Sequence, residues 1–211
     1  MEEMLSPSFT HEKLDDPTVE DLIDVFEDLW RGCIFEPVKS LIASPHGSVA
    51  AMCVLCSYYE AIESLYTGNS SRNRSQEFFV KGFSRVFSSS EGMDVGAKEI
   101  YIHVRCGLAH EGMLRSKVHY SNVGRKPFFL TYPKNDDGSL DLSRPSNSIV
   151  VNPERMFEAT VQHFVSYVKL LRSQEDTELV ENFESFVTEQ YDVGSGDSII
   201  GMTYEEFSGE P

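Results

Sequence analysis

The sequence has almost no basic residues at its two ends and no long hydrophobic run. Residues 1–30 carry ten acidic residues against one basic residue, and residues 174–211 carry eleven acidic residues and no basic one. The net charge of −16, taken alone, argues against a protein that binds nucleic acid. The longest apolar run, SVAAMCVLC at 48–56, is far shorter than the roughly 20 residues of a bilayer-spanning helix, which predicts no membrane partner.

Signals for export are missing as well. The first residues, MEEMLSPSFTHEKLDD, contain neither the basic region nor the apolar region of a secretory signal. The chain has only four cysteines, Cys33, Cys53, Cys56 and Cys106. Because no export signal supports disulfide formation, we expect reduced thiols and a cytoplasmic location.

The motifs of several enzyme classes are absent. No glycine-rich phosphate loop follows a predicted strand, and no nucleophile elbow is present. Cys53 and Cys56 form a Cys-x-x-Cys pair, but a structural zinc site usually needs a second pair. A redox pair usually opens a helix after a strand, whereas this one lies inside an apolar helix. We therefore expect core cysteines, and neither a metal nor a cofactor.

The acidity is confined to the ends of the chain. Residues 72–126 carry ten basic residues against five acidic ones, so the middle of the chain is mildly basic. One interpretation is that the acidic ends are solvated faces and tails. The other is that they shield a phosphate-binding centre.

Hydrophobic periodicity predicts a mostly helical fold, with strands limited to one segment. Thr18 and Asp21 form a capping box before the first helix, and Asp94 and Asn152 cap two later ones. Gly112 suits the position that follows a helix C-terminus. The expected helices cover 18–42 with a kink or restart at Pro37, 49–68, about 75–88, about 94–111, 153–172 and about 175–190. Two or three short strands are expected, with 128–132 and 148–151 as the most favoured pair.

The fold class that follows is all-α, an antiparallel helical bundle with a small β-hairpin or sheet insert. We expect residues 1–173 to form a single helical domain, with the insert at about 117–151. An acidic C-terminal helix at 174–193 and an acidic tail at 194–211 follow.

The segment YIHVRCGLAHEG at 101–112 places Arg105 and His110 in a helix that we expect to be buried. At about 100° per residue, a spacing of five separates the two side chains by about 140°. A site shared across a two-fold axis would bring them together, which predicts a homodimer. Gly107 would permit close approach of a backbone or ligand. The alternative is that both residues are purely structural. Arg105 would then form a salt bridge, and His110 would form a hydrogen bond near the helix C-terminus.

RCGLAHEG at 105–112 resembles the Arg-x4-His motif of the HEPN superfamily, in particular the Arg-Cys-Gly-Leu-x-His segment of bacterial HEPN-like proteins. The resemblance covers about residues 18–112. The position after the arginine is often Asn, Asp or His in active members, whereas here it is Cys106.

This resemblance implies a HEPN-like bundle that is a metal-independent endoribonuclease or a non-catalytic RNA or nucleotide binder, often a homodimer. Carried over to this sequence, His110 would act as general acid or base on the ribose 2′-hydroxyl, and Arg105 would stabilise charge on the phosphate. Histidine and arginine suit these tasks chemically. The alternative function is a non-catalytic helical interaction module, for example with an antitoxin-like protein partner in a defence or toxin–antitoxin complex.

Overall fold

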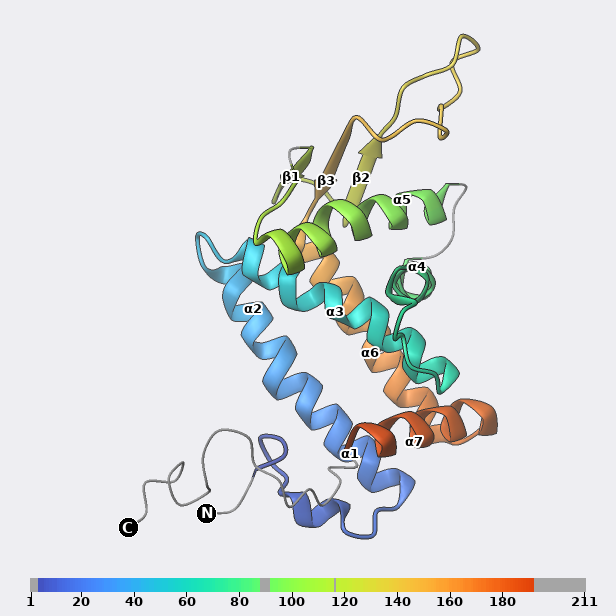
Figure 1. Cartoon of the computed structure of the whole chain (residues 1–211). Coiled ribbons are helices and arrows are strands. Elements are labelled where there is room, and N and C mark those ends of the chain that lie inside the picture. Colours follow the sequence, from blue (N-terminus) through green and yellow to red (C-terminus); the bar gives the residue numbers. More distant parts are fainter. Residues whose placement is uncertain (1–3, 88–91, 116, 192–211) are drawn as a thin grey trace, which may run out of the picture.

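The computed structural model describes residues 4–87, 92–115 and 117–191 (Figure 1). The expected acidic tail at 194–211, and the last residues of the expected helix 174–193, lie outside these ranges. The α-helices are α1 (Val19–Leu29), α2 (Glu36–Ala43), α3 (Ser48–Thr67), α4 (Ser75–Val86), α5 (Met93–Ile100), α6 (Pro153–Ser173) and α7 (Thr177–Tyr191).

The first long helix is continuous through α1 and α2 but changes its pitch between them. The capping box at its start is confirmed, because Thr18 and Asp21 each bond the other's backbone N–H. Six residues, Trp30–Phe35, form a π-helical segment, η2. Pro37 follows directly, and proline cannot supply the hydrogen bond of an α-helical interior. The widened turns accommodate Pro37, and the helix continues where the sequence predicted a kink or restart.

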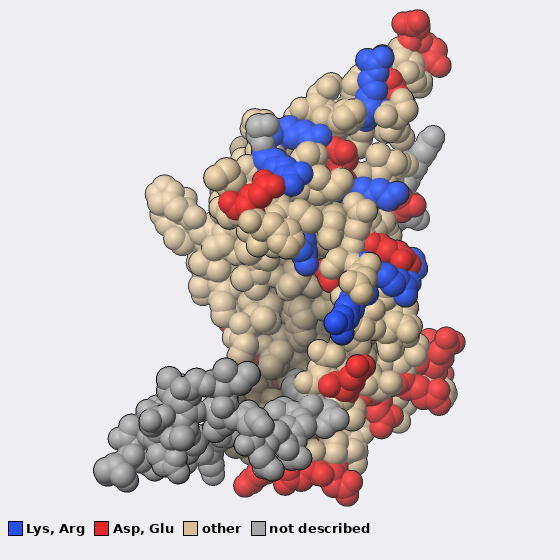
Figure 2. All heavy atoms as spheres, in the orientation of Figure 1, with Lys and Arg blue, Asp and Glu red and all other residues tan. Residues whose placement is uncertain are grey.

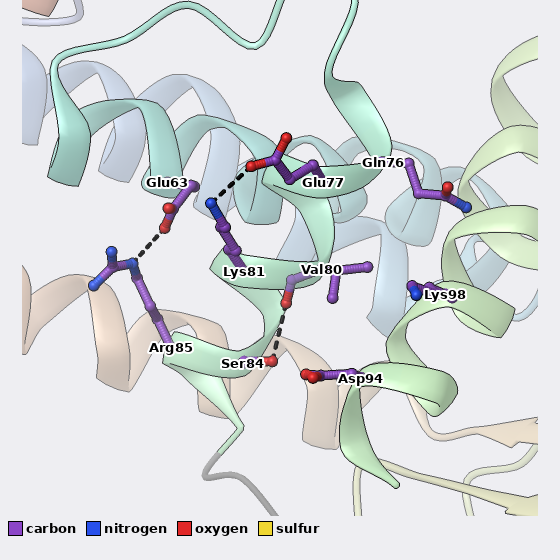
Figure 3. A pocket seen from close by; sticks show the side chains of 9 residues that line it. All are labelled: Glu63, Gln76, Glu77, Val80, Lys81, Ser84, Arg85, Asp94 and Lys98. Carbon is purple, nitrogen blue, oxygen red and sulfur yellow. Dashed lines mark hydrogen bonds and ion pairs between the residues drawn. The ribbon is translucent and has the colours of Figure 1, made fainter.

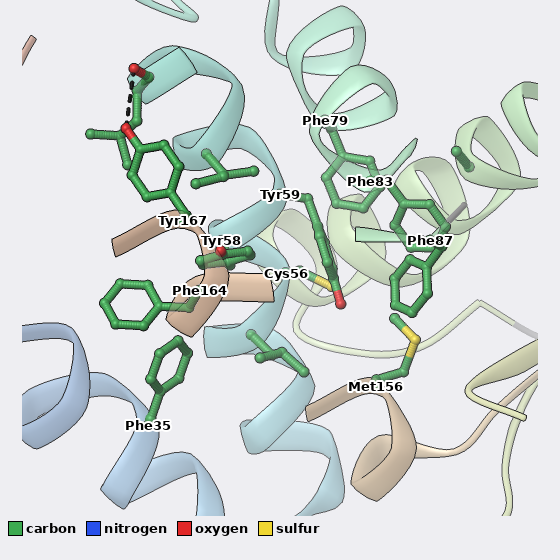
Figure 4. Close-up of a cluster of buried hydrophobic side chains, with 14 of the residues drawn as sticks. Phe35, Cys56, Tyr58, Tyr59, Phe79, Phe83, Phe87, Met156, Phe164 and Tyr167 are labelled. Carbon is green, nitrogen blue, oxygen red and sulfur yellow. Dashed lines mark hydrogen bonds between the residues drawn. The ribbon is translucent and has the colours of Figure 1, made fainter. Parts of the chain in front are cut away.

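Helix α3 is the centre of the core and packs against α2, α4, α6 and α7. Figure 4 shows Tyr59 of α3 facing the rings of Phe79 and Phe83 on α4, with centroid distances of 5.4 and 5.0 Å. Gly82 permits this packing, because a Cβ atom there would lie 1.8 Å from the Tyr59 carbonyl oxygen. The Tyr59 hydroxyl keeps a polar partner inside the core, the Thr160 hydroxyl on α6 at 3.1 Å.

The acidic C-terminal helix shares this core. The apolar face of α7 buries Leu179, Phe183 and Val187 among the side chains of the central cluster. On the other side of the bundle, Asn152 accepts a hydrogen bond from the Arg155 backbone and caps α6, as predicted. The polar face of α7 carries the acidic residues, so its strong negative charge stays in solvent while its apolar face packs.

The insert is a three-stranded sheet with the order β1–β3–β2. Its strands are β1 (Val118–Tyr120), β2 (Phe128–Thr131) and β3 (Ser148–Val151). β2 and β3 pair antiparallel, which confirms the predicted pair, with Phe128 opposite Val151. The third strand, β1, whose range the sequence did not predict, runs parallel to β3 at the edge of the sheet. The structure is therefore mostly helical with a small sheet, which lies beside α5 in Figure 1.

Two predicted boundaries are wrong. The helix expected at 75–88 ends at Val86. Asp94 does not cap the next helix, because Gly92, with φ of 79°, occupies the capping position and Asp94 lies in the first turn. Gly112 does end that helix in the left-handed conformation, as predicted. None of the helices within the described ranges is long and apolar enough to cross a membrane.

Ion pairs fasten the acidic N-terminal helix to the bundle. Arg172 of α6 reaches Glu20, Asp24 and Glu27 of α1 at 2.6, 2.9 and 2.9 Å. These contacts hold the pKa of the arginine above its usual value, because its charged form is hydrogen-bonded by three carboxylates. One guanidinium therefore offsets the repulsion among several carboxylates on α1.

His163 of α6 has a structural role. Its Nδ1 atom shares a hydrogen bond of 2.8 Å with the Tyr58 hydroxyl of α3. Burial lowers the pKa of His163 to about 4, and the nearby positive charge of Arg85 acts in the same direction. The imidazole is therefore neutral in the folded protein at neutral pH.

This lowered pKa predicts a pH-dependent stability. The unfolded chain binds a proton at His163 near pH 6.5, whereas the folded chain does so only near pH 4. The free energy of unfolding should therefore fall as the pH drops from about 6.5 to about 4. In His163→Phe this part of the pH dependence should disappear. Urea denaturation at several pH values measures it, and parallel profiles for variant and wild type would contradict the assignment.

Candidate functional site

The helix that begins at Met93 changes its hydrogen-bonding pattern at Tyr101. Two π-helical segments follow α5, η3 over Tyr101–Arg105 and η4 over Gly107–Glu111. In a π-helix each N–H group bonds to the carbonyl five residues earlier, so residues five apart come close together. Arg105 Nη1 and His110 Nε2 lie 3.4 Å apart. The predicted separation of about 140° is therefore wrong, because it assumed an α-helix.

The contact has a consequence for assembly. One chain brings Arg105 and His110 together, so the angular argument for a homodimer no longer holds. The dimer now rests on the family resemblance alone. His103, which precedes this pair on the same helix, faces elsewhere and lies 3.6 Å from Glu99.

Glycines at two positions explain how the helix ends. The Gly107 carbonyl accepts hydrogen bonds from the N–H groups of Gly112 and Met113, so the chain turns back over the last π-helical turn. A Cβ atom at Gly107 would lie 2.7 Å from the Met113 carbonyl oxygen. The close backbone approach expected at Gly107 is therefore confirmed, and the approaching group is the chain itself.

Glu60 of α3 holds the arginine from the other side. Its Oε2 atom accepts a hydrogen bond of 3.1 Å from Arg105 Nη2. Its Oε1 atom accepts from the hydroxyls of Ser71 and Ser75 at 2.7 and 2.6 Å. Only 16% of the Glu60 side chain and 23% of the Arg105 side chain are exposed. The ion pair is therefore largely shielded from solvent. Glu60 and His110 contact different nitrogen atoms of the guanidinium and together orient it.

The sequence alone did not indicate Glu60, Ser71 or Ser75 as site residues. The signal that could have pointed to Glu60 is an acidic residue in the most apolar helix of the chain, where a charge needs a partner. The structural interpretation predicted a salt bridge for Arg105, and Arg105 does form one with Glu60. It coexists with the His110 contact, and the His110 side chain itself is exposed. The site thus combines an accessible imidazole with an arginine held in place.

The cysteines divide between core and surface. Cys56 is buried as predicted, and burial raises the pKa of its thiol to about 12, so it stays protonated and unreactive. Cys53 is exposed, so its assignment to the core is wrong. Cys106 lies partly buried between Arg105 and Gly107. Among the residues that the structure describes, no group of three or more His, Cys, Asp or Glu side chains could hold a metal ion.

A second polar cluster ties the same helix to the sheet insert. Glu99 accepts hydrogen bonds from Lys117 Nζ at 2.8 Å and from the Ser146 hydroxyl at 2.6 Å. Burial and the charge of Lys117 lower the pKa of the neighbouring His103. Lys117 also bonds the Ser146 carbonyl, so this cluster crosslinks the helix and both ends of the insert.

The basic side chains lie at one end of the molecule. On the face shown in Figure 2, Lys and Arg side chains lie over α4, α5 and the strands, interspersed with Asp and Glu side chains. Asp and Glu side chains gather at the opposite end, where α1 and α7 lie against each other. The basic middle of the sequence and its acidic N-terminal part therefore occupy different regions of this face.

The sequence matches no known protein-family model, and comparisons with curated proteins and with solved structures also found no match.

Two helical glycines allow a test of the turn geometry. Gly107→Ala should destabilise the protein by about 1–3 kcal/mol, because the new methyl group meets a backbone oxygen. Gly96→Ala is the matched control, since its Cβ would lie 3.5 Å from a Leu130 methyl group, an ordinary contact. That variant should be neutral or stabilising by up to about 1 kcal/mol. Equal stability of the two variants in urea denaturation would contradict the geometry.

Proposed function

We propose that this chain is a HEPN-like protein that cleaves RNA without a metal ion at the Arg105–His110 site. The observation that supports the proposal is the 3.4 Å contact between the two side chains, with the histidine exposed and the arginine anchored. An arginine binds phosphate oxygens through a planar fork of N–H donors, and a histidine transfers protons near neutral pH. Together these are the groups that RNA transesterification needs.

The reaction proceeds by displacement at phosphorus. The ribose 2′-hydroxyl attacks the adjacent phosphorus, the bond to the 5′-oxygen breaks, and the products carry a 2′,3′-cyclic phosphate and a 5′-hydroxyl. His110 handles one proton, either accepting that of the 2′-hydroxyl or donating one to the leaving 5′-oxygen, and solvent water takes or supplies the other. Arg105 donates hydrogen bonds to the phosphate oxygens as negative charge develops. Glu60 acts as a positioning residue, because it touches only the arginine and the serines.

The family resemblance suggests a homodimer and a role in defence or in a toxin–antitoxin pair. The reduced cysteines expected from the sequence suggest a cytoplasmic location. Binding of RNA or a nucleotide without cleavage is the weaker form of the proposal, and Cys106 after Arg105 is the feature that favours it. The second candidate is a non-catalytic helical interaction module. The acidic end formed by α1 and α7 favours that candidate, since it would suit a basic protein partner.

Substitutions at the two residues test the chemistry. His110→Ala should reduce cleavage of single-stranded RNA by about 10²–10⁴-fold without loss of fold, because the side chain is exposed. Arg105→Ala should weaken both cleavage and phosphate binding, and Arg105→Lys should restore only part of either, because lysine lacks the fork. Cleavage should persist in EDTA.

The matched control is His119→Ala, which removes an exposed histidine from β1 and should leave cleavage unchanged. RNA with a 2′-deoxy nucleotide at the cleaved position should resist the enzyme. If wild type and His110→Ala cut equally, or if wild type neither cuts nor binds RNA, the ribonuclease proposal is wrong. The interaction module would then be the better assignment, with Arg105 and His110 as structural residues.

Mixing of inactive variants tests whether one chain supplies both groups. The Arg105–His110 contact lies within one chain, so a mixture of Arg105→Ala and His110→Ala should remain as inactive as either variant alone. Recovery of a substantial fraction of wild-type cleavage would mean that the functional site is shared between two copies. Light scattering at the assay concentration gives the oligomeric state that this comparison requires.

A further inference from the structure

A pocket of about 450 Å³ adjoins the Arg105–His110 site. It lies where the start of α4 faces the junction of α5 and η3. Two of its lining residues connect it to the site: Tyr101, whose ring centroid is 5.6 Å from the Arg105 guanidinium carbon, and Ser75, which donates to Glu60. The lining residues are Asn73, Arg74, Ser75, Gln76, Glu77 and Tyr101.

The aromatic ring of Tyr101 lines this pocket and is held in place by its neighbours. Phe79 packs edge-on against it with a centroid distance of 5.2 Å, and the ring remains partly exposed. The bases of single-stranded nucleic acids stack on aromatic rings that are fixed by packing and are also accessible from a pocket.

The polar groups of the pocket differ in their availability. Arg74 and Glu77 bind each other through two hydrogen bonds of 3.0 and 2.9 Å, and Lys81 also reaches Glu77 at 2.7 Å. The amide side chains of Asn73 and Gln76 are exposed and make no hydrogen bond to another described residue. Asn73 has a φ of 63°, a left-handed conformation that asparagine tolerates better than most residues. The side-chain amides of Asn73 and Gln76 are therefore the groups of this pocket that are available to form hydrogen bonds with a ligand.

We propose that this pocket binds one nucleobase of the RNA, with adenine preferred, by stacking on Tyr101 and hydrogen bonding to Asn73 and Gln76. Asparagine and glutamine amides pair with the N6 and N7 positions of adenine through one donor and one acceptor. Unpaired bases in single-stranded RNA expose these edges. The inference rests on the proposed function, because it assigns the base to the nucleotide next to the phosphate at Arg105.

A neighbouring groove gives the strand a path away from the pocket. It measures about 800 Å³, shares Gln76 and Glu77 with the pocket and continues between α4 and α5 to Lys98 (Figure 3). Figure 3 shows Lys81 and Arg85 bound to Glu77 and Glu63, so this groove is close to neutral and adds little phosphate affinity. Base recognition in the pocket, and not charge along the groove, should therefore dominate the choice of RNA.

Binding of non-cleavable RNA tests the pocket without requiring catalysis. The probes are 2′-O-methyl hexamers of A, C, G or U, measured by fluorescence anisotropy with the full chain. The A hexamer should bind most tightly. Tyr101→Leu should weaken its binding by about 5- to 150-fold, the range found for the loss of one stacked base, whereas Tyr101→Phe should keep it.

The amide variants test the preference for adenine separately. Asn73→Ala and Gln76→Ala should each reduce the advantage of the A hexamer over the U hexamer, by up to about 150-fold. The matched controls are Gln162→Ala, an exposed amide on α6, and Phe129→Ala, an exposed aromatic on β2. Both should bind like wild type. Because the amide variants remove exposed side chains, they remain informative even if Tyr101→Leu does not fold.

The outcomes separate this inference from the proposed function. If wild type cleaves RNA in a His110-dependent manner but binds all four hexamers equally, the base pocket is wrong and the ribonuclease proposal stands. The same holds if Tyr101→Leu folds and binds the A hexamer like wild type. If wild type neither cleaves RNA nor binds any hexamer, both proposals fall together.

Discussion

The proposed site depends on one constraint, the i→i+5 hydrogen bonding of the helix between Tyr101 and Glu111. An α-helix of the same sequence would direct Arg105 and His110 to different faces, whereas the π-helical turns bring them into contact. π-Helical turns are uncommon and occur frequently at functional sites. Their role here is to place two polar groups of one helix at one accessible point.

The widened turns depend in turn on their surroundings. Gly107 lets the returning chain approach its backbone, and the segment that follows crosses to Lys117 and the sheet insert. Glu60 pulls the guanidinium toward α3 from the other side. The end of the helix, the sheet insert and α3 therefore all make contacts with this helix. The geometry of the site depends on these contacts as well as on the 101–112 segment itself.

Helix α3 explains how charge is tolerated so near an aromatic core. It carries two acidic residues one turn apart, Glu60 and Glu63, and each receives an arginine from a neighbouring helix. The Glu63 side chain is only 4% exposed, so a carboxylate there requires its Arg85 partner at 2.6 Å. Removing one member of such a pair costs more than the pair contributes, because the remaining charge stays buried. The pairs therefore also specify how α4 and η3 sit on α3.

Several features followed from sequence alone, because local chemistry decides them. The helix caps at Thr18 and Asn152, the left-handed turn at Gly112 and the antiparallel pair of strands were predicted correctly. Each depends on residues a few positions apart or on a simple alternation of apolar side chains. The candidate pair Arg105 and His110 was also found this way, as polar residues in a helix expected to be buried.

Only the tertiary structure decided how those two residues meet and what surrounds them. The hydrogen-bonding period of a helix varies with the packing around it, and no local pattern distinguished a π-helical turn from an α-helical one at 101–111. Glu60 lies 45 positions from Arg105, and the pocket at Tyr101 joins the start of α4 to η3. Contacts between distant segments form when whole helices pack. The sequence around either partner therefore does not reveal which residue the other partner will be. The sequence therefore determined which groups are present, and the packing of α3, α4 and the insert determined their geometry.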